Sequence, residues 1–439
     1  MTDSTALLTD RYEYTMVDAA IQAGTAERQS VFEVFGRRLS GGRRYGVVAG
    51  TGRLLQAVAD FRLTDDELSW LSDEHIVRRP TLDWLADYRF TGRITGYQEG
   101  EIYFPGSPIL VVEGTFAECV LLETVLLSVL NYDSAVATAA ARVVSAASGR
   151  PVAEMGSRRT GEWSAVAAAR AAWIAGFSAT SNLEAGRRWG VPTMGTAAHA
   201  FTLLHDTEEE AFRAQVAALG TGTTLLVDTF DVPTAVRRAV EVAGPELGAV
   251  RIDSGDLASQ VAEVRAQLDS LGATKTRITV TSDLDEYSVA SLSSSPVDAY
   301  GVGTSVVTGS GYPAAGMVYK LVAHQDDQGE WVSVAKKSSG GKSSVGGRKH
   351  AFRRLSDSGV ARAEVLRIEE HGSDSHPAPK HAERALHVTL AEGGVPDPRW
   401  LGPEGTKLAR EHHAAAMAEL PPDAFRLSGG DPVLPTVYK

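Results

Sequence analysis

The stretch VPTMGTAAHAF (residues 191–201) decides how the fold of this chain is interpreted. Its apolar first part stops at Gly195, and the polar residues Thr196 and His199 follow before the apolar character resumes. This pattern predicts a buried strand that ends in a polar rim, with a titratable ring where the strand opens. A single histidine in such a place is more often structural than catalytic, so the interpretation depends on the rest of the chain.

Four later stretches repeat this arrangement of an apolar run followed by polar residues. They are LLVDTFD (225–231), AVRIDSGD (249–256), ITVTSDLDE (278–286) and DAYGVGTS (298–305). In α/β proteins the carboxyl ends of parallel strands meet at one edge, where ligands bind. Five strand ends that carry Asp, Arg, Ser, Thr or Gly therefore predict one shared site.

The spacing of the strands predicts an α/β architecture. Between residues 151 and 322, the strand candidates are PVAEMG, VPTMGT, TLLVDT, AVRID, ITVTS, DAYGVG and MVYKLVA. They recur at intervals of roughly 20–40 residues with helical stretches between them, as βαβ units require. A nearly closed βα barrel is the first interpretation and a doubly wound open sheet is the second.

Changes in composition and in hydrophobic pattern divide the chain into four segments. Residues 1–115 mix helices with short alternating strands and predict an α+β domain, whereas residues 116–335 carry the buried helices and the βα rhythm of a catalytic barrel. Residues 336–354 form a basic Gly/Ser-rich loop that lacks the glycine spacing of a P-loop, so it is either a solvated loop or a cover for a polyphosphate. Residues 355–439 add strands and a helix that we expect to pack on the N-terminal domain.

The composition excludes several classes of protein. The 439 residues carry a net charge of −12, which argues against nucleic acid as the main partner. The only cysteine, Cys119, lies in an apolar stretch, so no internal disulfide forms and a cytoplasmic location is expected. The N-terminal residues do not resemble a signal peptide, and no apolar run reaches the ~20 residues of a membrane span. We therefore expect no membrane partner.

The residues at the proposed rim indicate a site for an anion. Arg251 and Asp253 flank Ile252, so on a strand both side chains point to the same face, and neither is cheaply buried alone. The other polar or small residues at the strand ends are Arg158, Arg159, Asp228, Ser282, Asp283, Gly301, Gly303 and Thr304. Arginines can hold an anion while carboxylates bind a divalent cation or a sugar hydroxyl, and GVGTS offers backbone N–H groups to a phosphate. The combination predicts a phosphorylated, anionic substrate.

Long motifs in a characteristic order extend over most of the chain. They are LLTDRYEYTM, FEVFGRR, LLETVLLSVLNY, EMGSRRTGEWSAVAAAR, GFSATSN, VPTMGTAAHAF, LLVDTFD, VRIDSGDL, SDLDE and GVGTSVVTGSGYPAAGMVYKLV. Together they resemble the nicotinate phosphoribosyltransferase family. The resemblance implies an α/β fold in which an irregular βα (TIM-like) barrel is joined to an α+β domain built from the N-terminal region and part of the C-terminal region. It also implies a type II phosphoribosyltransferase that forms a homodimer with shared active sites.

The reaction implied by this resemblance belongs to NAD biosynthesis. Nicotinate and 5-phosphoribosyl-1-diphosphate give nicotinate mononucleotide and diphosphate, with Mg²⁺ as cofactor and ATP hydrolysed as a co-substrate. His199 matches the histidine that ATP phosphorylates in the family. Asp228 and Asp253 match acids on the ribose or metal side, so they count with His199 as catalytic candidates. No direct metal motif is present, and we expect Mg²⁺ to be bound by the diphosphate, with Asp228 or Asp253 as candidate protein ligands.

The resemblance also assigns substrate contacts. Arg251, Thr196 and Arg158 match contacts to nicotinate, and Tyr12 matches a ring that stacks on the pyridine from across the dimer interface. Gly303 and Thr304 match the cradle of the 5-phosphate. The residues expected to bind phosphoribosyl diphosphate are Ser282, Asp283, Gly301, Gly303 and Thr304.

Two positions depart from the pattern of relatives, and they bear on ring stacking and on the choice of substrate. Met155 stands where many relatives carry Phe, and its thioether covers a ring less rigidly than an aromatic side chain does. Ala197 stands where nicotinamide-using relatives carry an acid, which favours a carboxylate substrate. The runner-up is a phosphoribosyltransferase that uses quinolinate or nicotinamide, but the second carboxylate of quinolinate would require more basic residues.

Two alternatives come from other classes. A catalytically silent relative that binds nucleotides for regulation is disfavoured by the intact His199, Arg251 and Thr304. An unrelated phosphate-binding barrel such as an aldolase would require a Schiff-base lysine at a strand end. Lys320 in MVYKLVA is the candidate for that role, and we interpret it as structural or phosphate-binding.

Overall fold

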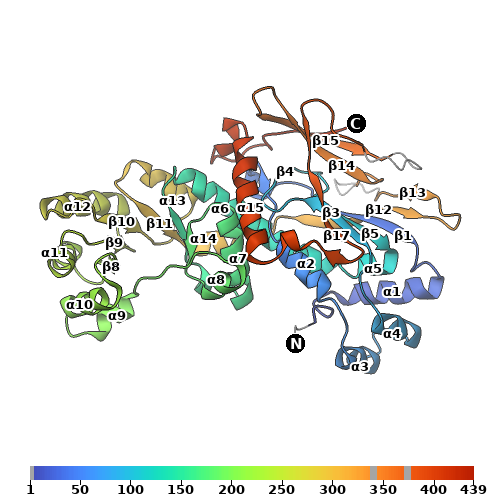
Figure 1. Cartoon of the computed structure of the whole chain (residues 1–439), viewed down its shortest axis with the longest axis horizontal. Coiled ribbons are helices and arrows are strands. Elements are labelled where there is room, and N and C mark those ends of the chain that lie inside the picture. Colours follow the sequence, from blue (N-terminus) through green and yellow to red (C-terminus); the bar gives the residue numbers. More distant parts are fainter. Residues whose placement is uncertain (1–3, 337–343, 370–376) are drawn as a thin grey trace. The chain divides into compact units, whose positions relative to one another are not determined.

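A computed structural model describes residues 4–336, 344–369 and 377–439 and shows two compact units. The first unit combines Met1–Ala137 with Tyr312–Lys439, and the second is Thr138–Gly311 (Figure 1). The second unit is shorter than the catalytic segment 116–335 that the sequence analysis delimited, because both ends of that segment belong to the first unit.

The first unit contains a seven-stranded antiparallel sheet. Its order is β13 (Trp331–Ser333), β12 (Met317–Gln325), β1 (Gln29–Gly36), β5 (Leu110–Thr115), β3 (Arg93–Tyr97), β17 (His387–Glu392) and β18 (Val395–Pro396). The prediction that MVYKLVA continues the βα rhythm is wrong, because β12 runs antiparallel to β1 in this sheet. The rings of Phe32 and Tyr319 stack across that strand pair with centroids 4.8 Å apart.

Two smaller sheets and a set of helices complete the first unit. The four-stranded sheet has the order β16 (Glu383–Ala385), β14 (Lys349–Leu355), β15 (Ala361–Ile368) and β19 (Thr436–Tyr438), and β2 (Gly46–Val47) pairs with β4 (Ile102–Tyr103). The helices are α1 (Arg11–Ala23), α2 (Thr51–Ala59), α3 (Asp65–Asp73), α4 (Arg79–Ala86), α5 (Phe116–Val120) and α15 (Gly402–Ala418), with 3₁₀ turns η1 (Ser40–Gly42), η4 (Pro398–Trp400) and η5 (Pro422–Phe425). The basic segment 336–354 is not all loop, since its last residues lie in β14, and residues 337–343 lie outside the described chain.

The long helix α6 (Glu123–Ala146) is apolar, and many of its side chains are buried. The combined stretch Phe116–Ala146 is long and apolar enough to cross a membrane by length and composition, contrary to the expectation from the sequence. However, 61% of its most apolar window is buried inside the protein, as in the core helix of a globular protein. Leu126, Leu130 and Val136 are almost completely inaccessible to solvent.

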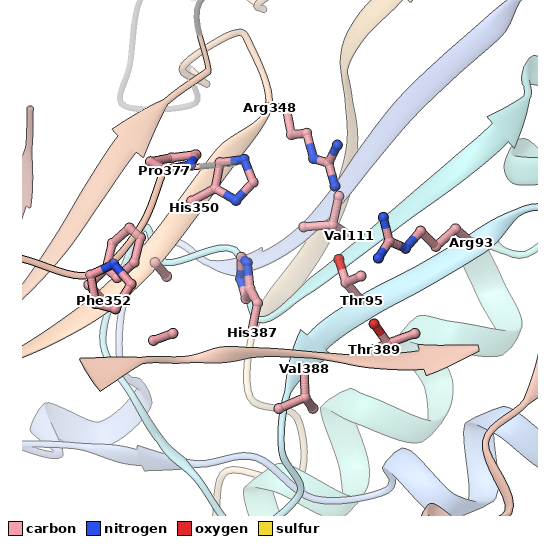
Figure 2. Close-up of a pocket in the computed structure, with 13 residues that line it drawn as sticks. Arg93, Thr95, Val111, Arg348, His350, Phe352, Pro377, His387, Val388 and Thr389 are labelled. Atoms are coloured by element: carbon pink, nitrogen blue, oxygen red, sulfur yellow. The ribbon is translucent and has the colours of Figure 1, made fainter. Parts of the chain in front are cut away.

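A cavity of about 200 Å³ lies in the first unit among strands β3, β5, β14 and β17 (Figure 2). Arg348 Nη2 lies 2.9 Å from Glu113 Oε2, and His350 Nε2 lies 3.0 Å from Glu369 Oε2. Burial lowers the pKa of His387 to about 4, so this ring is neutral at pH 7. These charged groups are paired within the protein, so we interpret the cavity as structural and not as a ligand site.

The second unit is built around a six-stranded parallel sheet. The strands follow the order β7 (Ala179–Thr180), β6 (Val152–Glu154), β11 (Ala299–Val302), β10 (Arg277–Val280), β9 (Ala249–Ile252) and β8 (Thr224–Leu226). The helices are α7 (Glu162–Ile174), α8 (Leu183–Trp189), α9 (His199–Leu204), α10 (Glu208–Leu219), α11 (Val232–Ala243), α12 (Leu257–Ser270), α13 (Glu286–Ser291) and α14 (Thr304–Val307), with 3₁₀ turns η2 (Ser157–Arg159) and η3 (Leu292–Ser294). In the described chain no pairing joins β7 to β8, so the sheet is an open half-barrel and the predicted TIM-like barrel is not complete.

The stretch 191–196 forms no regular strand. It makes one parallel bridge, between Thr193 and Thr180, and only Val191 at its start is fully buried. Pro192 has no N–H to donate to a sheet, which limits the pairing to this single bridge. The prediction of a buried strand here is therefore wrong, although the stretch does lead into His199 at the start of α9.

Candidate active site

The carboxyl ends of four neighbouring strands of the parallel sheet surround a cavity of about 220 Å³. It is lined by Met155, Arg158, Arg159, Arg251, Asp253, Thr281, Ser282, Asp283, Gly301, Gly303 and Thr304. These residues lie at or directly after the ends of β6, β9, β10 and β11. The structure thus brings together most of the site residues selected from the sequence. Three arginines face two aspartates, so the lining carries a positive balance that suits an anion.

The guanidinium of Arg251 is held at every nitrogen. Its Nε donates to Thr281 Oγ1 at 2.9 Å, and its Nη1 donates to Thr196 Oγ1 and to the Ala197 carbonyl, each at 3.3 Å. Nη2 lies 3.2 Å from Asp253 Oδ1, which confirms that the two side chains share a face of the strand. The Thr281 hydroxyl also donates to Asp253. One threonine therefore orients both the cation and the carboxylate.

His199 lies between two carboxylates. Its Nε2 is 3.8 Å from Asp228 Oδ1 and 3.8 Å from Asp253 Oδ2, and its Nδ1 is 3.2 Å from Thr229 Oγ1. The imidazole is 40% exposed, whereas the Asp228 carboxylate is only 2% exposed. Asp228 Oδ2 accepts hydrogen bonds from the backbone N–H of Asp253 and from the hydroxyl of Ser254, at 2.9 and 2.7 Å. Its other oxygen, Oδ1, has no hydrogen-bond partner among the described residues.

Two glycines at the end of β11 keep the cavity floor open. A Cβ on Gly301 would lie 2.5 Å from Thr281 Cγ2 and 2.8 Å from the sulfur of Met155. A Cβ on Gly303 would lie 3.1 Å from the Met155 carbonyl oxygen, directly before the first turn of α14 at Thr304. A side chain at Gly301 would therefore displace its neighbours, and one at Gly303 would fit only if the Met155 backbone shifted slightly. The Met155 thioether lies on this floor, where it can contact a flat ligand.

The chain is similar over almost its full length to a known enzyme. The family model described as the nicotinate phosphoribosyltransferase (NAPRTase) N-terminal domain matches residues 7–131. The nicotinate phosphoribosyltransferase pncB1 of Mycobacterium tuberculosis is 54% identical over 442 residues, which cover 99% of this chain and 95% of that protein. The chain belongs to the nicotinate phosphoribosyltransferase family.

Solved structures agree with this membership. The crystal structure of human nicotinic acid phosphoribosyltransferase superposes with a TM-score of 0.80 at 25% identity and covers 98% of this chain and 97% of that one. The nicotinate-nucleotide pyrophosphorylase of Pyrococcus furiosus gives a TM-score of 0.76 at 22% identity, with 97% and 96% of the two chains covered, and shows a shared fold. The fold of this chain is thus shared with the human enzyme.

Two residues of interest lie in the first unit. Tyr12 is on α1 and 44% exposed, and partial burial together with the carboxylates of Glu123 and Glu13 raises its pKa to about 12. Its stacking on a pyridine stays a prediction. Lys320 lies on the antiparallel strand β12, where its Nζ donates to the Tyr319 carbonyl. Lys320 does not lie at the end of a parallel strand, so it does not fit the Schiff-base lysine that an aldolase would require.

Several side chains that support the site were not predicted from the sequence. They are Glu154, Thr229, Ser254 and Thr281. A signal existed for Thr281, because it follows β10 just as Asp253 follows β9, and the two strands pair in parallel. Thr229 and Ser254 each stand directly after a selected aspartate. Nothing in the sequence pattern distinguishes Glu154 from an ordinary strand-end acid.

Replacing Thr281 by valine is expected to lower kcat/KM for nicotinate by roughly tenfold to hundredfold. The change keeps the shape but removes the hydroxyl that binds both Arg251 and Asp253, and a hydrogen bond to a charged group contributes about 1.5–3 kcal/mol. Steady-state kinetics would measure the loss. Thr281→Ser keeps the hydroxyl and should retain most activity, and equal kinetics for the valine variant and the wild type would contradict this role.

Proposed function

We propose that this chain transfers the phosphoribosyl group of 5-phosphoribosyl-1-diphosphate to the ring nitrogen of nicotinate, giving nicotinate mononucleotide and diphosphate for NAD biosynthesis. One observation carries the proposal: Arg251, Asp253 and Thr304, far apart in the sequence, line a single cavity in a chain that belongs to this family. The M. tuberculosis and Bacillus subtilis relatives, at 54% and 38% identity, bear the name of this activity.

The cavity offers a partner for each part of the substrates. The guanidinium of Arg251 can attract the nicotinate carboxylate and donate to it through the remaining N–H of Nη2, with Arg158 as a second cation. The backbone N–H groups around Gly303 and the hydroxyl of Thr304 can hold the 5-phosphate, and Ser282 and Asp283 lie beside them for the rest of phosphoribosyl diphosphate. Quinolinate carries a second carboxylate and would require more basic residues than this cavity has. A monocarboxylate is therefore the better fit.

Breaking the bond between C1 of the ribose and the diphosphate builds positive charge on the sugar. The carboxylate of Asp253, which contacts Thr281 and Arg251, can stabilise that charge. The pyridine nitrogen must remain unprotonated to form the new bond to C1, and the cationic side chains around it favour the unprotonated form. The bond to nicotinate forms as the bond to diphosphate breaks, so the diphosphate carries away the electron pair.

The carboxylates also fit a magnesium ion. Asp228 Oδ1 is buried without a hydrogen-bond partner among the described residues, and carboxylate oxygens are ligands that Mg²⁺ prefers. Within residues 4–336, 344–369 and 377–439, no group of three or more His, Cys, Asp or Glu side chains could hold a metal ion. The ion is proposed to be held jointly by substrate phosphates and by Asp228 or Asp253. When bound, Mg²⁺ supplies positive charge that neutralises the departing diphosphate.

We further propose that ATP phosphorylates His199. The ring is accessible to a nucleotide, and the Thr229 hydroxyl fixes its orientation through Nδ1. A neutral imidazole nitrogen attacks the γ-phosphorus, ADP leaves with the electron pair of the broken bond, and a neighbouring carboxylate can accept the ring proton. The family resemblance adds that two copies share active sites through Tyr12 and that the protein works in the cytoplasm.

A product assay with and without ATP tests the proposed function. Wild type is expected to form nicotinate mononucleotide faster with ATP, and His199→Ala to retain at most a slow synthesis that ATP does not change. His205→Ala, at the other end of α9, is the matched control and should keep the ATP response. An unchanged ATP response in His199→Ala would remove this residue from its role, and equal turnover of nicotinamide or quinolinate would remove the proposed selectivity.

A further inference from the structure

A buried carboxylate without a cation directly precedes Met155, which lines the candidate site. Glu154, the last residue of β6, is 1% exposed. No Lys, Arg or His of the described segments lies within ion-pair distance of it, and burial raises its pKa. An isolated acid in the interior costs stability that an apolar residue of similar size would not. Such a cost points to a role outside stability.

The first oxygen of Glu154 holds the turn that carries the arginines. Oε1 accepts a 2.5 Å hydrogen bond from the backbone N–H of Gly156. Gly156 directly precedes the turn η2, which contains Arg158. A Cβ on Gly156 would lie 2.3 Å from Val307 Cγ1 and 2.9 Å from the Gly303 carbonyl oxygen. The hydrogen bond therefore fixes the arginine turn tightly against the backbone that is proposed to bind the 5-phosphate.

The second oxygen of Glu154 holds the segment that leads to the histidine. Oε2 accepts a 2.5 Å hydrogen bond from the hydroxyl of Thr180 on β7. The backbone of Thr180 bonds to Pro192 and Met194 on the neighbouring segment, at 2.9 Å in each case. That segment continues to Thr196, which accepts a hydrogen bond from the guanidinium of Arg251.

We infer that Glu154 is a positioning residue that fixes the arginine turn and the Thr196–His199 segment relative to each other. Only a carboxylate offers an acceptor to both donors, because the amide of glutamine has one acceptor oxygen and one NH₂ group. This inference rests on the proposed function, since it assigns Arg158 and Thr196 to nicotinate binding. It predicts that Glu154 acts on catalysis through Arg158 and Thr180 without touching substrate.

Double-mutant cycles on the full chain test the inference. Glu154→Gln and Arg158→Ala are made singly and together, and kcat/KM for nicotinate is measured for each variant. We expect Glu154→Gln to lower kcat/KM by roughly tenfold to hundredfold, mainly through KM, because it disorders a binding turn. In the double variant the loss from Arg158→Ala should shrink by at least threefold, since the turn is already displaced.

A role in folding alone would give a different pattern. If Glu154→Gln only reduced the folded fraction, its effect would add to that of Arg158→Ala, would lower kcat at unchanged KM, and the inference would be overturned. Thr180→Val, which removes the donor to Oε2, should reproduce part of the loss and should not add fully to Glu154→Gln. If wild type forms no product, the proposed function fails, and this outcome is distinct from an additive cycle in an active enzyme.

Discussion

Replacing Arg251 by glutamine is expected to lower kcat/KM for nicotinate by about 100- to 1,000-fold. The side chain is 16% exposed, and its loss would leave Asp253 without its cation as well as removing the partner of the substrate carboxylate. Removing one member of a largely buried, hydrogen-bonded charge pair costs about 2–5 kcal/mol, which spans this range. Steady-state kinetics with nicotinate as the varied substrate would measure the effect.

Arg159→Gln is the matched control for this prediction. Arg159 lines the same cavity but is exposed, and we expect its replacement to change kcat/KM by less than about tenfold. Arg251→Lys should also remain strongly impaired, because an ammonium group cannot reproduce the planar set of donors that binds Thr281, Thr196 and Asp253. Similar kinetics for Arg251→Gln and Arg159→Gln would contradict the assignment of the nicotinate contact.

The pairing of Arg251 with Asp253 shows what sequence alone can predict about the site. Side chains alternate along a strand, so two residues that flank Ile252 share a face whatever the order of the sheet. The contacts from Thr281 and from Thr196 depend on which strand or segment lies next to β9. That order, with β10 beside β9 and β11 beside β6, follows from packing across the whole unit and leaves no local signal.

The errors in the predicted fold have the same origin. MVYKLVA has the composition of a buried strand, which does not indicate whether the strand joins the parallel or the antiparallel sheet. It joins the antiparallel sheet because it pairs with β1, which lies far away in the sequence. In the stretch 191–196 the apolar composition predicted a strand, but Pro192 and the exposed Thr193 allow a single bridge. Elements that depend only on neighbouring residues do leave a local signal, as in α3, where Thr64 and Glu67 form a capping box.

Replacing Arg353 by methionine is expected to lower the free energy of unfolding by about 3–5 kcal/mol. Arg353 on β14 is fully buried, and its Nη2 donates to the Ile102 carbonyl at 2.7 Å. The same nitrogen lies 3.7 Å from Glu101 Oε1 and 3.7 Å from Glu364 Oε2, which are also buried. Methionine fills a similar volume but leaves these carboxylates with less positive charge, and breaking a buried ion pair on one side has this cost. Urea unfolding of the full chain would measure it.

The pH dependence separates this electrostatic cause from a packing defect. Although burial alone would raise the pKa of Glu101, His412, Arg353 and Arg384 hold it well below its usual range. A carboxyl group with a lowered pKa stabilises the fold above its unfolded pKa of ~4.3, and this stabilisation is lost as the pH falls toward the folded pKa. The difference between wild type and Arg353→Met should therefore be largest near pH 7 and shrink below about pH 4. Arg213→Met, which removes an exposed pair with Glu209 on α10, should cost less than about 0.5 kcal/mol, and a pH-independent loss in Arg353→Met would assign the effect to packing.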